Sequence, residues 1–139
     1  MRAMSPLEQR IRKLEDDLYL ARTLVLELTG PELHDLLYPP TDLDTPRAAH
    51  AWLTAAMGKV LALAEVLTIE EPLCTSQRAV CPLCRGDAND YNRAGPGYKY
   101  PEGLRRHLLG ANISTQCPVS KIALDLALES ARIHAMYPR

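Results

Sequence analysis

Two cysteines separated by two residues, Cys81 and Cys84, lie in a segment whose sequence has no helical period. From residue 70 to residue 116 the chain is rich in Cys, Pro, Gly, Asn and Tyr, and an apolar repeat returns only around PEGLRRHLLG. Backbone of this composition is irregular or forms short strands. Because such a segment cannot bury a sizeable apolar core by itself, we expect its core to come from other parts of the chain.

The segment before it begins with a long predicted helix over residues 6–29. Ser5 is placed to cap this helix, Pro6 suits its first position, Glu8 completes a capping box, and Gly30 ends it. Its apolar residues alternate spacings of four and three, which is typical of a coiled-coil seam. The seam consists of Leu7, Ile11, Leu14, Leu18, Ala21, Val25 and Leu28.

A second long helix is predicted over residues 46–69, after a short helix over 31–37 and a proline-rich linker. Thr45 is placed to cap the second long helix, which repeats the same four-three spacing as far as Leu67. A last helix is expected from Val119 to Ala135. The two long helices suggest an antiparallel hairpin, and two such hairpins would form a four-helix bundle in a dimer. The alternative is a monomeric three-helix bundle closed by the last helix.

These elements predict a mainly α fold with three parts. Residues 1–72 would form the helical hairpin, residues 73–118 a small irregular or ββα metal-binding module, and residues 119–139 a helix packed on the body. The composition agrees, because 47% of the 139 residues are hydrophobic and the chain contains no Phe and one Trp. We expect a homodimer through the N-terminal helices.

The Cys-Pro-Leu-Cys sequence is typical of a tight turn that presents two thiolates to a metal ion. His107 lies on the predicted short helix, and Cys117 returns just before the last helix. The set Cys81, Cys84, His107 and Cys117 predicts one structural zinc ion per chain. The alternatives are a redox-active thiol pair, an ordinary surface role for His107, and an all-thiolate site in which Cys74 replaces His107.

The module resembles the two-Cys-two-His zinc finger in a Cys-Cys-His-Cys version. The resemblance rests on the knuckle Cys81-Pro82-Leu83-Cys84, an aromatic residue at Tyr98 or Tyr100, and Leu104 three residues before His107. It implies a β-hairpin between the knuckle and Tyr100 that packs on the short helix, with Leu104 and an aromatic ring as a miniature core. The spacings between Cys84 and His107 and between His107 and Cys117 are longer than in the usual finger.

Charge is unevenly distributed although the formal net charge is −1. Residues 1–73 hold seven Lys and Arg against twelve Asp and Glu, whereas residues 74–121 hold seven against three. A basic surface of this kind can contact phosphates or an acidic protein. The predicted partner-binding residues are Arg85, Arg93, Lys99, Arg105 and Arg106.

No apolar stretch approaches the roughly 20 residues that cross a bilayer, and the N-terminus is highly charged where a signal peptide needs an apolar core. We therefore expect a cytoplasmic protein. Three thiolates and one imidazole would close the zinc site, and no phosphate-binding loop or nucleophile motif is present, so we expect no enzymatic activity.

Two non-enzymatic functions remain. The first is protein–protein interaction, as an adaptor or an inhibitor, by analogy with small accessory proteins of bacteria and their phages. The second is a dimeric zinc-finger regulator that binds nucleic acid. The balanced total charge, and aromatic residues that do not alternate with basic ones, favour the first function.

Overall fold

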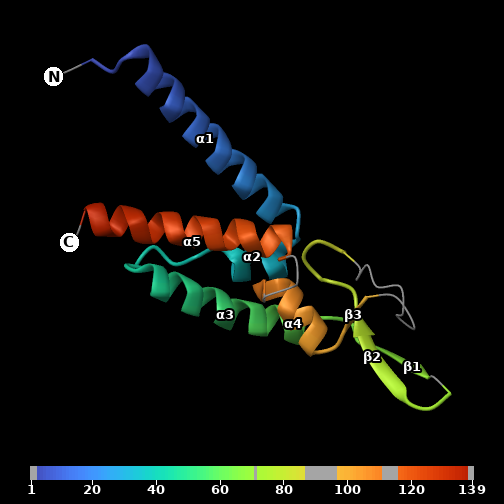
Figure 1. The fold of residues 1–139 in the computed structure, drawn as a ribbon. Helices are drawn as coiled ribbons and strands as arrows, with labels where there is room; N and C mark the ends of the chain where they lie inside the picture. The colour runs from blue at the N-terminus through green and yellow to red at the C-terminus, as the bar shows by residue number, and fades with distance from the viewer. Residues whose placement is uncertain (1–2, 71, 87–96, 111–115, 138–139) are drawn as a thin grey trace.

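The computed structural model describes residues 3–70, 72–86, 97–110 and 116–137. This part of the chain is mostly helical, as expected, and carries a small three-stranded antiparallel sheet (Figure 1). Its elements in chain order are α1 (Pro6–Glu27), α2 (Pro31–Leu37), α3 (Pro46–Ala62), β1 (Leu67–Glu70), β2 (Thr75–Ala79), β3 (Tyr98–Lys99), α4 (Glu102–Leu109) and α5 (Pro118–Met136).

The starts of the two long N-terminal helices follow the capping residues. The Ser5 hydroxyl accepts a hydrogen bond from the Glu8 backbone N–H at 3.1 Å, and the Thr45 hydroxyl accepts one from the Ala48 N–H at 3.0 Å. Each bond satisfies a backbone donor that has no partner within the first turn. Gly30 separates α1 from α2 with φ +96°, a conformation that glycine adopts without strain.

The second long helix is shorter than predicted, because α3 ends at Ala62 rather than at residue 69. The four-three spacing continues through Leu63 and Leu67, but Leu67–Glu70 forms strand β1 instead. The strand pairs antiparallel with β2, with Leu67 opposite Arg78. Thr68 and Ile69 are β-branched and suit an extended backbone. Pairing with β2 therefore determines the structure of this segment, although its apolar spacing continues that of the helix.

The small sheet lies next to the Cys-Pro-Leu-Cys turn. Strand β2 leads into the turn, and β3 lies beside β2 with Ala79 opposite Tyr98. The expected hairpin lay between the knuckle and Tyr100, but in the described residues β3 pairs with β2, which precedes the knuckle. Neither β1 nor β2 was predicted from the sequence. Residues 87–96, which the predicted hairpin also included, lie outside the described residues.

The long helices pair differently from the expected hairpin. Helix α3 runs antiparallel beside α5 and also packs on α4, whereas the main contacts of α1 are with α5 and α2 (Figure 1). The apolar face of α3, which includes Leu53, Met57 and Val60, is buried by these contacts. Both α1 and α5 carry an apolar stripe that could pack on α3. The spacing of apolar residues in the sequence therefore does not determine which of the two helices covers it.

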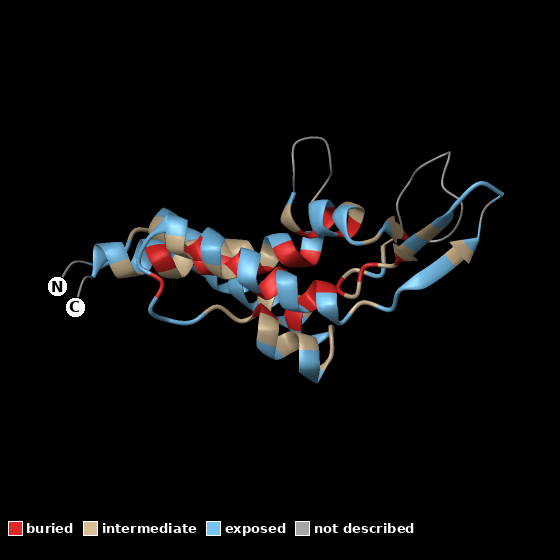
Figure 2. Ribbon diagram, turned by 90° about the horizontal axis from the view of Figure 1, so that it is seen from below, coloured by how far each residue is buried: buried red, intermediate tan, exposed pale blue. Residues whose placement is uncertain are grey.

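A continuous apolar core joins the helices to the cysteine segment. Met57 of α3 and Leu104 and Leu108 of α4 are fully buried in the same cluster as Cys81 and Cys117. Figure 2 shows buried residues along the helices and up to the knuckle, while the β1–β2 hairpin is mainly exposed. The irregular segment thus takes its core from the helices, as we expected. In the described part of the chain, no helix is both long and apolar enough to cross a bilayer.

Two hydrogen bonds join the end of α4 to the start of α5. The Cys117 backbone N–H donates to the His107 carbonyl at 2.7 Å. The buried Ser120 hydroxyl donates to the Leu108 carbonyl at 2.7 Å. Both acceptors lie in the last turn of α4, where carbonyl groups have no partner within the helix.

Replacing Ser120 by Ala should destabilise the protein. The substitution leaves the Leu108 carbonyl buried without this donor, and we expect the free energy of unfolding to fall by about 1–2 kcal/mol. Urea denaturation of the metal-loaded protein measures the change. Thr54→Ala serves as the control, because the exposed Thr54 hydroxyl donates to the His50 carbonyl of its own helix. An effect of Ser120→Ala no larger than that of the control would contradict this role of Ser120.

Candidate metal centre

The first two candidate ligands lie on a tight turn directly after β2. The Arg85 N–H donates to the Cys81 carbonyl at 2.9 Å, and the Cys81 N–H donates to the Gly86 carbonyl at 3.2 Å. The Gly86 N–H also donates to Cys84 Sγ at 3.2 Å. An N–H directed at sulfur stabilises the thiolate form that a metal ion requires. The turn brings Arg85 to φ +58°, in the left-handed region.

The third candidate ligand, His107, lies on the buried face of α4. Its side chain is 6% exposed, and its ring stacks on the Tyr98 ring with centroids 4.2 Å apart and planes 18° from parallel. Tyr98 comes from β3, so the sheet fixes the ring that supports the imidazole. The aromatic residue that the resemblance placed at position 98 or 100 therefore contacts the site directly.

The fourth candidate ligand, Cys117, lies at the N-terminus of α5 and is fully buried. Gly110 ends α4 in the left-handed conformation, with φ +72° and ψ +49°. The chain then returns so that the Cys117 N–H bonds to the His107 carbonyl. This bond places Cys117 directly beside His107 although the two residues are ten positions apart in the sequence.

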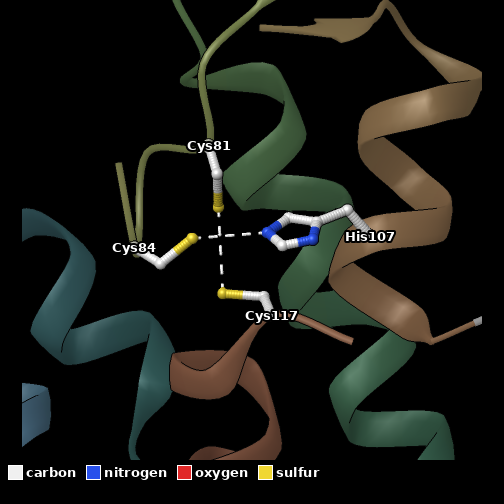
Figure 3. A group of neighbouring side chains, drawn as sticks. All are labelled: Cys81, Cys84, His107 and Cys117. Carbon is white, nitrogen blue, oxygen red and sulfur yellow. Dashed lines mark hydrogen bonds between the residues drawn. The ribbon is translucent and has the colours of Figure 1, made fainter. Parts of the chain in front are cut away.

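The four side chains converge on one point (Figure 3). The ligand atoms of Cys81, Cys84, His107 and Cys117 all lie within 4.8 Å of one another. Cys81 Sγ is 3.8 Å from Cys117 Sγ, and Cys84 Sγ is 3.3 Å from His107 Nε2. None of the three cysteines forms a disulfide. The group can therefore hold a metal ion.

These distances fit a tetrahedral ion. Zn–S bonds of about 2.3 Å and Zn–N bonds of about 2.0–2.1 Å place tetrahedral ligands about 3.8 Å apart for two sulfurs and about 3.6 Å apart for sulfur and nitrogen. The observed separations of 3.8 Å and 3.3 Å are close to these values. Sulfur and imidazole donors select Zn²⁺ or a similar soft ion over Mg²⁺ or Ca²⁺.

Burial and the closeness of the sulfur atoms shift the pKa values of the three thiols. A hydrogen bond from the Cys81 thiol lowers the pKa of Cys117, while the same bond, together with burial, raises the pKa of Cys81. Burial also raises the pKa of Cys84. In this arrangement the Cys81 thiol donates a hydrogen bond to Cys117 Sγ. A bound cation would take the place of that proton by stabilising both thiolates.

The remaining candidate ligands lie elsewhere. Cys74, which could have replaced His107, is exposed between β1 and β2 and does not belong to the four-residue group. His34 and His50, to which no ligand role was assigned, also lie outside the group: the His34 ring contacts the Tyr38 ring at a tilt of 49°, and His50 is exposed on α3. The ligand set with His107 is therefore the one that the described residues bring together.

The predicted partner-binding residues are exposed where they are described. Arg85 follows the knuckle, Lys99 ends β3, and Arg105 and Arg106 lie on the outer face of α4. Arg105 pairs with Glu102 one turn away. Arg93 lies outside the described residues.

Two supporting residues were missed by sequence reasoning. Gly86 matters because a Cβ at this position would lie 2.9 Å from Cys84 Sγ, and a glycine two residues after the second cysteine was a readable signal. Ser120 matters because it joins α4 to α5, and nothing in its sequence context distinguished it from a serine on the helix surface.

Comparison with models of protein families, with curated proteins and with solved structures gives no match for this chain.

Replacing Gly86 by Ala should weaken metal binding. The new methyl group would contact Cys84 Sγ below van der Waals distance, and the sulfur cannot move away without leaving the site. We expect the affinity for Zn²⁺ to fall by about ten- to a hundredfold, the size of effect seen when groups around metal ligands are disturbed. Competition with a chromophoric chelator measures it.

The matched control is Gly58→Ala on the exposed side of α3. A Cβ at Gly58 meets nothing within 4 Å, so this variant should keep its metal affinity and gain up to about 1 kcal/mol of helix stability. Equal affinities in the two variants would show that Gly86 does not shape the site.

Proposed function

We propose that Cys81, Cys84, His107 and Cys117 bind one zinc ion that stabilises the fold. The proposal rests on three thiols and one imidazole, all buried except the half-buried Cys84, whose ligand atoms lie within 4.8 Å of one another. Two of the separations, 3.8 Å and 3.3 Å, are close to those of a tetrahedral ion. Four protein donors fill the coordination sphere of Zn²⁺ and leave no position for a reactive water, which is the arrangement of structural sites. The ion would contribute stability and no chemistry, and the protein would not be an enzyme.

The ion would join three segments that lie far apart in the sequence. They are the knuckle after β2, helix α4 and the start of α5. Tyr100 of the same region donates a hydrogen bond to the Leu61 carbonyl of α3 at 3.2 Å, so the metal-binding module also contacts the helical body. Zinc would therefore hold the basic residues of the module in a fixed position on the protein.

The function that follows is protein–protein interaction, as an adaptor or an inhibitor. The module presents Arg85, Lys99, Arg105 and Arg106, all exposed, on segments that the metal ligands hold together. Lys99 lies beside the first turn of α4, with its Cβ 3.2 Å from the Cβ position of Gly103. A rigid basic surface of this kind complements an acidic surface on another protein.

The alternative is a regulator that binds nucleic acid through the same basic residues. The exposed Arg105 and Arg106 of α4 support it. Two observations favour a protein partner. Tyr98 stacks on His107 and the Tyr100 hydroxyl bonds to the helical body, so neither ring is placed to stack on a base. Arg105 is also partly neutralised by Glu102.

Removal of one ligand should abolish stoichiometric zinc. We expect one zinc ion per chain in the purified wild type, and near zero in Cys81→Ser and His107→Ala after dialysis against a competing chelator. Elemental analysis and thermal unfolding measure metal content and stability together. Cys74→Ser is the control and should keep its zinc, because Cys74 lies outside the group. Zinc loss in Cys74→Ser with retention in His107→Ala would support the all-thiolate site instead.

Reversing charge on α4 should abolish partner binding. We expect the zinc-loaded wild type to retain a lysate protein that the double variant Arg105→Glu/Arg106→Glu does not retain, and nuclease treatment to leave this difference unchanged. Arg47→Glu, an exposed change of the same charge on α3, is the control for net charge. Nuclease-sensitive retention would favour the nucleic-acid alternative, and equal retention by the α4 and α3 variants would contradict a binding role for α4.

A further inference from the structure

Most of helix α1 stands away from the rest of the protein. Among the described residues, its C-terminal part is anchored through buried Leu26 and through Arg22, which pairs with Asp125 at 3.6 Å and Glu129 at 3.5 Å on α5. Figure 1 shows the N-terminal half of α1 diverging from α5. A helix of this length with so little packing is marginal in water, because isolated helices gain little from backbone hydrogen bonds alone.

The unpacked half of α1 carries a continuous apolar seam. Leu7 is 68% exposed, Ile11 47%, Leu14 59% and Leu18 49%. Their spacing of four, three and four residues places them on one stripe of the helix. Glu15 and Arg22, which line a hollow together with residues of α5, lie about 50–70° around the helix from the centre of this stripe at 100° per residue. The stripe itself stays about half exposed or more.

We propose that a second copy of this chain covers the seam, so that two α1 helices form a parallel two-stranded coiled coil. The heptad assigns Ile11, Leu18 and Val25 to the a positions, and Leu7 and Leu14 to the d positions. β-branched residues at a, with leucine at d, favour two parallel strands over three or four. Val25 packs against the core of its own chain. In the free half, Ile11 at a, with Leu7 and Leu14 at d, matches this preference for a dimer.

The charged residues beside the seam also favour a second copy of this chain in the parallel orientation. In a parallel pair, Arg10 at position g lies opposite Glu15 at position e of the second copy, and the symmetry repeats this attraction on the other side. An antiparallel pair that overlaps the same leucines places Glu15 opposite Glu8 or Glu15 of the second copy. The same register also places Arg10 opposite Asp17, so attraction on one side of the antiparallel pair is offset by repulsion on the other. The parallel pair has attraction on both sides and is therefore favoured.

Dimerisation through α1 goes beyond the proposed function, because neither the metal ligands nor the basic residues of α4 take part. The free end of α1 and the small sheet lie at opposite ends of the molecule (Figure 1). A dimer would therefore keep both basic surfaces open, and two linked surfaces bind a bivalent partner more tightly than one.

The first test is the mass of the zinc-loaded protein in solution at micromolar concentration. Each chain has a mass of 15.4 kDa, and we expect light scattering to give the mass of two chains for the wild type. Leu14→Asp should give the mass of one chain. The matched control is Leu20→Asp, because Leu20 is 58% exposed, close to the 59% of Leu14, but lies off the seam. Circular dichroism and zinc content confirm that both variants are folded.

The second test is the direction of the pair. Arg10→Glu and Glu15→Arg each place like charges at both g–e contacts and should raise the dissociation constant by about tenfold. An equimolar mixture of the two variants restores opposite charges at every contact and should recover the wild-type affinity. A wild type of single-chain mass, equal loss in Leu14→Asp and Leu20→Asp, or a mixture no tighter than its components would overturn the proposal. A monomer that keeps its zinc would leave the proposed function intact.

Discussion

The approach of four ligand atoms from three segments is the constraint on which the rest of the structure depends. Three thiols and one imidazole lie within 4.8 Å of one another, and Cys81 and Cys117, whose sulfurs are 3.8 Å apart, are both fully buried. Burying thiolates without a cation is costly, because the protein interior does not solvate charge as water does. A bound divalent ion would remove that cost and hold the knuckle, α4 and α5 together. The segment between β1 and α5 is otherwise poor in apolar residues that could do so.

The metal site is continuous with the helical core and does not form a separate miniature core. Leu104 and Leu108 bury against α3, and Cys81 and Cys117 belong to the same apolar cluster as Met57. Stability of the site and stability of the helices are therefore coupled. The exposed N-terminal half of α1 is not part of this apolar cluster. Loss of the metal ion and loss of the proposed dimer contact should therefore be independent of each other.

The four residues that converge and the helix starts could be predicted because they depend on local chemistry. A Cys-x-x-Cys turn, a histidine on a short helix, and Ser5 or Thr45 before a proline each specify their own geometry within a few residues. Helix pairing could not be predicted, because the same four-three spacing fits α3 against either α1 or α5. The predicted end of α3 was wrong for a related reason. Leu67 continues the helical spacing of apolar residues, but it pairs with Arg78 on β2 and so belongs to a strand. The stacking of Tyr98 on His107 depends on β3 pairing with β2, which sequence spacing does not encode.

X-ray absorption at the zinc edge tests the central claim most directly, because it counts the atoms bound to the ion. The account predicts three sulfur neighbours at about 2.3 Å and one nitrogen at about 2.0–2.1 Å, with the outer-shell signature of an imidazole ring. A shell of four sulfurs, or one that contains oxygen from water, would contradict the closed site made by Cys81, Cys84, His107 and Cys117.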